Sequence, residues 1–589
     1  MSPSPSAELS PEHWRPAGRV LLARTVAELA YEDVLTPVPD GAGWRLGLPA
    51  AEYRFAARRG AFGSWRVDPA TLTRDGEPAD DPLRFVLDAR DVLGLSGPVL
   101  ADVVRDLTAT QVADARLRSR AVPAAQLADL SHEDLEAHQT GHPCLFLNKG
   151  RLGFSAADAA RYAPEAAGEF RLEWIAVAPE LATFTGDRDE LLATELDTGT
   201  RAAFAERIRA AGRDPEAFVW LPVHPFQWDE VVLPLFAPQL AERRIVHLGQ
   251  SPDRYRPMQS IRTLTNLDRP DRRNVKVPLM IRNTLVWRGL SAAQTTCAPH
   301  LTRWLRDRQA GDPDLADVTM LGEVASVAVP HPVYAELPDA PYRFHELLGA
   351  IWREPVAGHL RAGERARTMA TLLLEGSDGR AVVAELVARS GITPRDWLRA
   401  YLDALLPPLL HYLHRYGASF TPHGENVVLI SDAGEVPVRI ALKDFGADVE
   451  LLPFDLPEYA AIPDHVRALL HRWEPAELAH SILSAICAGH FRFFVGVVER
   501  HLGVPEPEFW DLVREPIVAY RRRHPELAER FAWFDLLTPE FGRVALNREQ
   551  LLGGGFHDRA ERDARFDVVH GVVANPLHRE ERPCSTPRS

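Results

Sequence analysis

Two polar residues in the C-terminal half, Asn426 and Asp444, have the chemistry of magnesium ligands. Mg²⁺ is a hard cation that takes oxygen ligands, and an amide oxygen together with a carboxylate suits it. An asparagine followed by an Asp-Phe-Gly triplet is one way of holding Mg²⁺ against the phosphates of ATP. His423, Glu425 and Lys443 lie close to these two residues in the sequence. The group predicts a Mg-ATP site.

A short antiparallel hairpin must bring these residues together. An apolar run at 427–430, turn chemistry at 431–435 and apolar alternation over 438–442 predict its two strands. If Ile430 pairs with Val436, the polar residues at the outer ends of both strands meet. The hairpin is the best-defined short element in the sequence.

A small-molecule kinase is the alternative interpretation of the same residues. Kinases place an aspartate base about five residues before the magnesium-binding asparagine, and Thr421 stands at that position here. The sequence also lacks a Gly-rich loop followed by a Val-Ala-x-Lys strand. We therefore favour a site in which an acid substrate attacks ATP. Release of ADP, rather than of AMP and pyrophosphate, would establish the kinase.

A second polar array, between residues 260 and 288, has the chemistry of an anion pocket. Hydroxyl and guanidinium groups bind phosphate and carboxylate oxygens, and arginine can do so bidentately. Apolar alternation around 276–281 predicts a strand that presents polar groups at both ends. The array consists of Ser260, Arg262, Thr263, Lys276 and Arg288.

Bulk properties limit the classes of function. The 589 residues suggest several domains, and 67 Lys+Arg against 82 Asp+Glu give a net charge of −15, so no nucleic-acid partner is expected. No secretory signal and no apolar run of about 20 residues is visible, so no membrane association is expected. The four cysteines form no Cys-x-x-Cys pair, so we expect from them neither a zinc site nor a disulfide framework, and a reducing cytoplasm fits.

The ordered set of motifs resembles the IucA/IucC family of siderophore synthetases that work without non-ribosomal peptide synthetases. The resemblance covers nearly the whole chain. The matching pieces, in the family's order, are Gly141-His142-Pro143, Lys149-Gly-Arg151, Pro222-Val-His224-Pro225, Ser260-Ile-Arg262-Thr263, Lys276 with Arg288, Ile351-Trp-Arg353, His423-Gly-Glu425-Asn426, Asp444, Phe509-Trp510, His524-Pro-Glu526-Leu527, Leu546-Asn547-Arg548 and Asn575-Pro-Leu577.

The resemblance implies an α+β fold shaped like a cupped hand, with a distantly kinase-like palm, and commonly a homodimer. Its regions would be a thumb at 1–140, fingers at 141–335 and a palm at 336–589. It also implies adenylation of a carboxylate by Mg-ATP, followed by attack of an amine or hydroxyl. By motif, ATP would be bound by His142, Lys149, Ser260, Arg262, Thr263, Lys276, Arg288, His423 and Asn426; Mg²⁺ by Asn426, Asp444 and Glu425; and substrate by Arg262, Arg353 and Glu425, with Arg288, Lys276 and His423 catalytic.

Three positions depart from the family pattern. Leu145 stands where many members have a second histidine, and Thr421 and Glu425 replace a glutamate and a glutamine. Glu425 could restore a carboxylate for Mg²⁺ or set substrate preference. The Pro-His-Gly-Glu-Asn and Lys-Asp motifs are most similar to the subgroup acting on already acylated or amidated intermediates. The acid (a citrate derivative or a succinyl-hydroxamate) and the amine (a polyamine or hydroxamate amine) stay open.

A third interpretation is an iron-siderophore binding or release protein, because the C-terminal part has some likeness to ferric-siderophore reductases. An iron–sulfur cluster would need several cysteine ligands. The C-terminal quarter offers only Cys487 and Cys584, so this interpretation is disfavoured.

Overall fold

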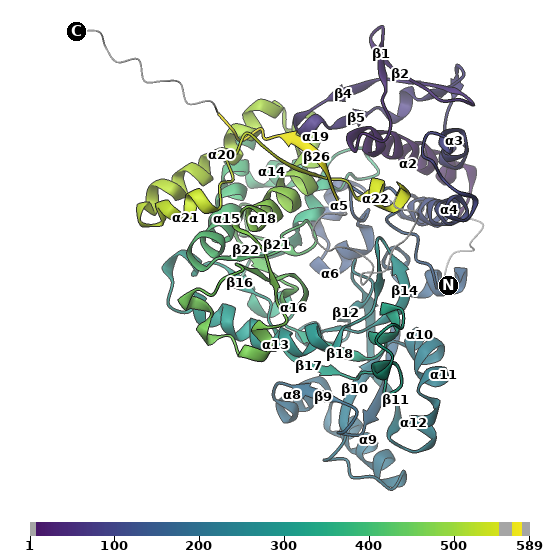
Figure 1. The fold of residues 1–589 in the computed structure, drawn as a ribbon, viewed down its shortest axis with the longest axis vertical. Coiled ribbons are helices and arrows are strands. Elements are labelled where there is room, and N and C mark those ends of the chain that lie inside the picture. Colours follow the sequence, from purple (N-terminus) through teal and green to yellow (C-terminus); the bar gives the residue numbers. More distant parts are fainter. Residues whose placement is uncertain (1–7, 553–567, 580–589) are drawn as a thin grey trace.

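The computed structural model describes residues 8–552 and 568–579 (Figure 1). These residues form helical layers packed on mostly antiparallel sheets, which confirms the α+β class. The two termini of the described chain lie on the outside of the molecule (Figure 1). The cupped-hand shape, the kinase-like palm and the region boundaries near residues 140 and 335 stay predictions. Cys584 lies outside the described residues.

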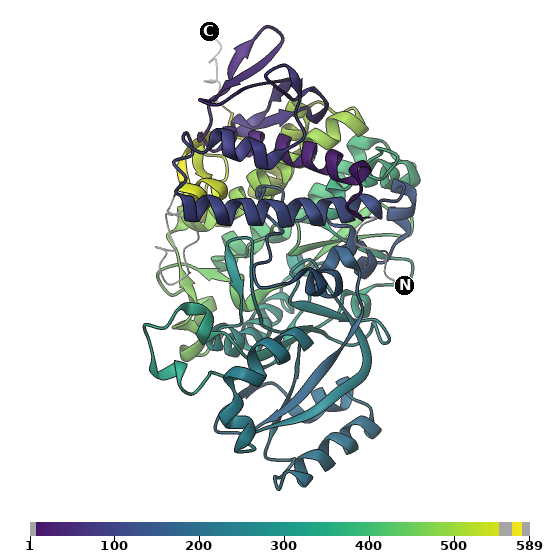
Figure 2. The ribbon, with the colours of Figure 1, turned by 90° about the vertical axis from the view of Figure 1, so that its right-hand side faces the viewer.

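The N-terminal region packs helices against a small antiparallel sheet (Figure 1, purple). Each long helix begins with a proline in its first turn, where the missing N–H costs nothing. The long helix α4 (Gly97–Ser119) crosses this region and is seen from its side in Figure 2. The elements are α2 (Pro11–Tyr31), α3 (Pro82–Ala89), α4 (Gly97–Ser119), and, in sheet order, β1 (Val38–Asp40), β2 (Gly43–Gly47), β3 (Glu52–Phe55), β6 (Thr73–Arg74) and β7 (Glu77–Pro78).

An eight-stranded antiparallel sheet fills the lower half of Figure 1. Its apolar core extends from Tyr162 to Trp352, and α13 (Ala292–Gln309) packs against β17. The sheet order is β10 (Val219–Val223), β8 (Phe170–Val177), β11 (Ile245–Pro257), β12 (Thr263–Asn266), β13 (Asn274–Lys276), β18 (Gly349–Arg353), β17 (Glu323–Ala328) and β9 (Thr183–Thr185).

The C-terminal region surrounds a four-stranded sheet with helices. The sheet order is β16 (Thr319–Met320), β22 (Pro437–Leu442), β21 (Val427–Ser431) and β19 (Arg365–Thr368). The long helix α15 (Pro394–Tyr416) packs against both β22 and α20 (Glu506–Arg523). Gly417, with φ 58°, ends α15 in the left-handed conformation that glycine adopts without strain.

One helical stretch, Pro475–Leu502, is long and apolar enough to cross a membrane by length and composition. It joins α18 (Pro475–Ile482), the π-helical segment η12 (Leu483–Phe491) and α19 (Arg492–Leu502). Of its most apolar window, 72% is buried inside the protein, as in a core helix.

The hairpin of β21 and β22 is present, but the expected register is wrong by three residues. Ile430 pairs with Arg439, not with Val436. The turn is longer because the Asp432 carboxylate accepts the backbone N–H groups of Gly434 (2.9 Å) and Val436 (3.0 Å). Consequently Val438 is 42% exposed instead of facing the core.

The single strand expected around 276–281 is also wrong. Lys276 ends β13 in the large sheet, whereas β14 (Leu279–Asn283) pairs with β15 (Val286–Arg288) in a separate two-stranded ribbon. Pro278 lies between the two strands and has no N–H to continue a ladder. The two ends of the polar array therefore belong to different sheets.

Candidate active site

An ion pair joins the anion-binding array to the hairpin. Lys276 donates from Nζ to Oδ1 of Asp444, across a sequence separation of 168 residues. Burial raises the pKa of Asp444, but the charges of Lys276, Arg353 and Arg262 hold that pKa well below its usual range. Asp444 has φ 75° in the left-handed region, a strained conformation that clusters at functional sites. The structure thus brings the two predicted clusters together.

A buried carboxylate, Glu323, was not found from the sequence. It begins β17, pairs in register with Arg353, and is fully buried. Its Oε2 accepts the backbone N–H of Gly446 at 2.8 Å, while Oε1 is buried without a hydrogen-bond partner in the described structure. Burial raises the pKa of Glu323, with Lys276 lowering it and Asp444 raising it. Only strand pairing places this residue at the site, and no local sequence signal marks it.

The oxygen donors of this cluster fit a hard divalent cation. Asp444 supplies one carboxylate, and Oε1 of Glu323 is a second carboxylate oxygen, without a hydrogen-bond partner in the described part of the chain. Asn426 is 5% exposed, and its Nδ2 donates to the carbonyl oxygen of Thr421 at 3.3 Å, which fixes the orientation of its amide. Two carboxylates and an amide oxygen are ligands that Mg²⁺ prefers.

Two histidines from distant motifs face each other across the site. The ring centroids of His142 and His423 are 6.4 Å apart. Burial lowers the pKa of both, that of His142 to about 3, and the nearby charge of Arg288 lowers both further. Nδ1 of His423 accepts the backbone N–H of Glu425 at 3.2 Å. Because a neutral imidazole carries one proton, Nε2 of His423 is then a hydrogen-bond donor.

The remaining array residues lie around these groups. Arg288 donates from Nη2 to Oγ1 of Thr284 at 3.0 Å, and Arg262 donates to the carbonyl oxygen of Gly289. Oγ of Ser260 accepts the backbone N–H of Thr263 at 3.2 Å, and Thr263 pairs with Lys276 across β12 and β13. Thr263 and Lys276 therefore lie on paired strands of the large sheet, and the hydrogen bond of Arg262 connects them to the end of the ribbon that carries Arg288.

The side chain of Lys149 is directed away from these groups, toward α4. Its ammonium donates to Oδ1 of Asp114 in α4 at 2.8 Å, to the carbonyl oxygen of Thr140 at 2.5 Å and to Oδ1 of Asn148 at 3.2 Å. These three acceptors match the three N–H donors of an ammonium. The contacts suit a residue that fixes the His142 loop to α4.

A second subsite of mixed charge lies beside the carboxylates. Arg353 is 4% exposed, and its Nε has no hydrogen-bond partner in the described structure. Burial lowers the pKa of Lys443, as does Arg353, while Glu425 and Glu136 oppose the shift. Glu136, which sequence reasoning also missed, is buried and accepts the backbone N–H of Gln259 at 2.7 Å. Two cations and two carboxylates thus lie close enough to influence each other's ionisation.

Asn547 holds the loop that carries His142. Its Oδ1 accepts the backbone N–H of Phe146 at 3.2 Å, and its Nδ2 donates to the carbonyl oxygen of Cys144 at 2.7 Å. The buried carboxylate of Glu32 accepts from the same Nδ2 at 2.7 Å and from the backbone N–H of Asn547 at 3.1 Å. Three distant segments are therefore fixed to each other behind the histidine loop.

The buried Glu32 should make stability depend on pH. Burial raises its pKa from 4.5 to about 7, against the hydrogen bonds that lower it. The folded state then binds a proton that the unfolded state has lost, so this stabilisation is present below about pH 4.5 and disappears as pH rises to about 7. Between low and neutral pH, the free energy of unfolding of the wild type should fall by roughly 3 kcal/mol through this group, and Glu32→Gln should remove that fall. The measurement is thermal unfolding of the wild type and the variant at pH 5 and pH 8. The exposed Glu77→Gln is the control, and an unchanged pH slope in Glu32→Gln would contradict the assignment.

Comparison with known proteins decides the family. The model of the IucA / IucC family matches residues 131–374. Rhizobactin siderophore biosynthesis protein RhbF of Rhizobium meliloti (strain 1021) is 36% identical over 581 residues, which cover 96% of each chain. This chain belongs to the IucA/IucC family. The family expected from the sequence is confirmed, and with it the expectation of a siderophore synthetase.

Other family members agree with this assignment. Aerobactin synthase of Escherichia coli is 35% identical over 91% of this chain and 94% of its own length. The solved structure of aerobactin synthetase IucC from Klebsiella pneumoniae superposes with a TM-score of 0.85 at 32% identity, covering 96% of this chain and 98% of that one.

A second family model, described as ferric iron reductase FhuF-like transporter, matches residues 395–558. That segment contains one cysteine, Cys487, and this residue is buried. One thiol cannot supply the four ligands of an iron–sulfur cluster. The match therefore does not favour a reductase.

Proposed function

We propose that this ligase activates the carboxylate of a siderophore precursor with ATP and joins it to an amine or hydroxyl, releasing AMP and pyrophosphate. The ion pair between Lys276 and Asp444 carries the proposal, because it joins an anion-binding array to a set of oxygen ligands. The relatives of this chain, a rhizobactin siderophore biosynthesis protein and an aerobactin synthase, support a siderophore precursor as the substrate.

The array would bind the triphosphate. Lys276, Arg262 and Arg288 would lie against phosphate oxygens, and the hydroxyls of Ser260 and Thr263 would add neutral donors. Preorganised donors aimed at developing charge are usually the largest catalytic contribution. This local cluster of positive charge is needed to bind an anionic triphosphate, because the chain as a whole has a net charge of −15.

The metal ligands would be Asp444, Asn426 and Glu323, with Glu425 beside them. When bound there, Mg²⁺ would neutralise phosphate charge and assist the departure of pyrophosphate. His142 would line the same pocket, with its ring centroid 6.4 Å from that of His423. We assign His423 as a hydrogen-bond donor to a phosphate or carboxylate oxygen rather than as the base, because its Nδ1 already accepts from Glu425.

The mixed-charge subsite would hold the two reacting molecules. Arg353 and Lys443 would bind carboxylates of the acid, and Glu136 with Glu425 would bind the ammonium of a polyamine or hydroxamate amine. Holding acid and amine in adjacent positions converts a bimolecular step into an effectively unimolecular one. A homodimer and a cytoplasmic location stay predictions.

Product analysis tests the reaction class. The purified protein is incubated with Mg-ATP, hydroxylamine or a polyamine, and a panel of citrate and succinyl-hydroxamate acids. We expect pyrophosphate and AMP in equal amounts, only when an acid is present, with an amide or hydroxamate product seen by mass spectrometry. Release of ADP instead would favour the kinase.

Glu323→Gln should weaken the metal site without removing side-chain volume. We expect acid-dependent pyrophosphate release to fall by roughly 10–100-fold, the usual effect of losing a group that supports a metal site, and to recover partly at high Mg²⁺. The reason is that Oε1 of Glu323 is buried without a hydrogen-bond partner among the residues that the structure describes. A Mg²⁺ titration of the initial rate is the measurement. An unchanged dependence on Mg²⁺ would remove Glu323 from the ligand set.

A further inference from the structure

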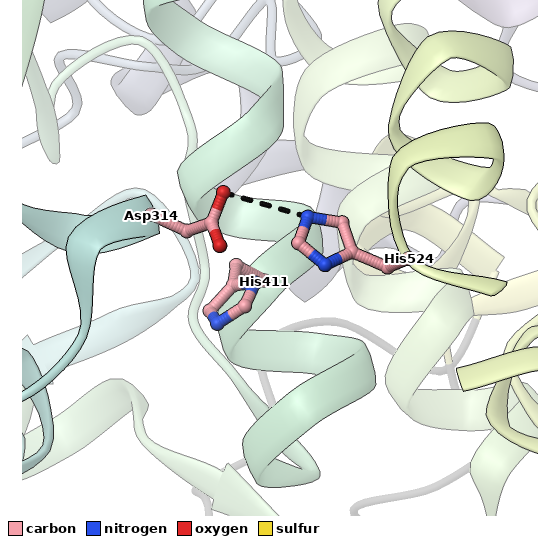
Figure 3. Close-up of side chains that lie close together, drawn as sticks. All are labelled: Asp314, His411 and His524. Atoms are coloured by element: carbon pink, nitrogen blue, oxygen red, sulfur yellow. Dashed lines mark ion pairs between the residues drawn. The ribbon is translucent and has the colours of Figure 1, made fainter. Parts of the chain in front are cut away.

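Three side chains outside the active site form a compact cluster of nitrogen and oxygen donors (Figure 3). Asp314 lies in the 3₁₀ segment η6 (Pro313–Leu315), His411 in α15, and His524 at the end of α20. Each offers one donor atom, and these atoms lie within 4.8 Å of one another. The exposed fractions are 4% for His411 and 8% for His524. The two imidazoles are therefore buried, while the side chain of Asp314 is 26% exposed.

Both imidazoles are held through their outer nitrogen. Nδ1 of His411 lies 2.9 Å from Oη of Tyr520, and Nδ1 of His524 lies 3.2 Å from Oε1 of Glu526. Metal-binding histidines commonly donate the other ring N–H to an oxygen in this way, which fixes the tautomer and the ring orientation. The Nε2 atoms are then the atoms available as ligands.

The two Nε2 atoms face carboxylates. Nε2 of His411 lies 2.7 Å from Oδ2 of Asp312, and Nε2 of His524 lies 3.4 Å from Oδ1 of Asp314, the ion pair drawn in Figure 3. Ligand atoms around a tetrahedral metal with bonds of about 2.0–2.1 Å are roughly 3.3 Å apart. The 3.4 Å between His524 and Asp314 matches this value, whereas the 2.7 Å between His411 and Asp312 is a hydrogen-bond distance that a shared metal ion would lengthen.

An unsatisfied atom points to a cation. Nε2 of His524 is buried and makes no hydrogen bond in the described structure, although it faces the carboxylate of Asp314. A lone pair opposite a carboxylate is unfavourable unless a proton or a metal ion lies between them. Arg523 also reaches Oδ1 of Asp314, at 3.6 Å, but its side chain is 55% exposed and can move into solvent.

We propose that Asp314, His411 and His524 bind one divalent transition-metal ion of the zinc class, with Asp312 as the fourth ligand. Two imidazoles with carboxylates suit Zn²⁺ and its first-row neighbours, whereas Mg²⁺ prefers oxygen donors alone. The site is separate from the Asp444 cluster and involves none of its residues. Its ion joins η6, α15 and α20, and α15 packs against β22 of the active-site hairpin. The metal is structural.

Metal content tests the proposal directly. The full-length protein is freed of metal with a chelator, loaded with Zn²⁺ in excess Mg²⁺ to occupy the magnesium site, and dialysed before elemental analysis. We expect one tightly held zinc per chain and an increase in the temperature of unfolding. Co²⁺ in place of Zn²⁺ should give the visible absorption bands of a tetrahedral site.

Matched variants separate binding from folding. His524→Gln and Asp314→Asn should each weaken zinc affinity at least tenfold and abolish the thermal shift. His414→Phe is the control, since it removes a buried histidine one turn along α15 but keeps the ring that stacks on Phe534. Circular dichroism of the metal-free proteins establishes that each is folded. Equal zinc content in the wild type and in both ligand variants, or no zinc in any of them, would overturn the proposal.

Discussion

Asp444→Asn is expected to lower acid-dependent pyrophosphate release by roughly 10²–10³-fold, the effect of removing one preorganised electrostatic group from an active site. The substitution keeps the size of the side chain but removes a negative charge that Lys276 and Arg353 stabilise. It therefore removes both a proposed metal ligand and the charged partner of Lys276. Initial rates of pyrophosphate release at saturating ATP are the measurement.

Stability must be measured in the same variant. Breaking a buried ion pair by removing one partner can cost about 3–5 kcal/mol, although part of the Asp444 side chain, 22%, is exposed. Asp432→Asn is the matched control, because it alters the turn at the opposite end of the same hairpin. We expect that control to stay active. Full activity of a folded Asp444→Asn protein would contradict the proposed site.

The second large effect is expected for Arg288→Ala. Arg288 lies near both histidines and extends from β15 at the edge of the pocket. Loss of its guanidinium should lower pyrophosphate release by roughly 10²–10³-fold, because charge on the leaving group is then less stabilised. Arg288→Lys should retain part of the rate, since it keeps the charge but not the fork of donors.

Arg343→Ala provides the control for this site. Arg343 stacks on Trp287, the neighbour of Arg288 in β15, with its guanidinium carbon 5.2 Å from the ring centroid. We expect it to leave the chemical step unchanged. Equal losses in Arg343→Ala and Arg288→Ala would indicate a disturbed ribbon rather than a lost phosphate contact.

The local signals in the sequence were strong enough to predict the hairpin and the polar residues at its open end. Alternating apolar residues and turn chemistry specify two strands, and these bring Asn426 next to Lys443, whose backbone N–H donates to the Asn426 carbonyl at 3.2 Å. The register was wrong because two backbone N–H groups donate to the Asp432 carboxylate and lengthen the turn. Such side-chain bonds decide loop length but leave little trace in hydrophobic patterning.

Motif chemistry also predicted the anion array. It did not predict which other motif residues would point toward the array and which would point away from it. Lys149 shares a motif with His142, yet its ammonium is taken up by Asp114 and two nearby oxygens. Glu323 and Glu136 carry no motif and enter the site only through strand pairing and loop packing. Burial then sets their ionisation, which no residue type specifies alone.

The sequence by itself determined the family, the α+β class and two local clusters of different composition, one rich in cations and one with the oxygen donors proposed for Mg²⁺. Only the tertiary structure decided that Lys276 meets Asp444, that His142 faces His423 and that the buried Glu323 lies beside the Asp444 segment. The physical reason is the separation along the chain over which each kind of interaction acts. Propensity, turn chemistry and periodicity act over a few residues, whereas contacts across 168 positions depend on how whole sheets and helices pack.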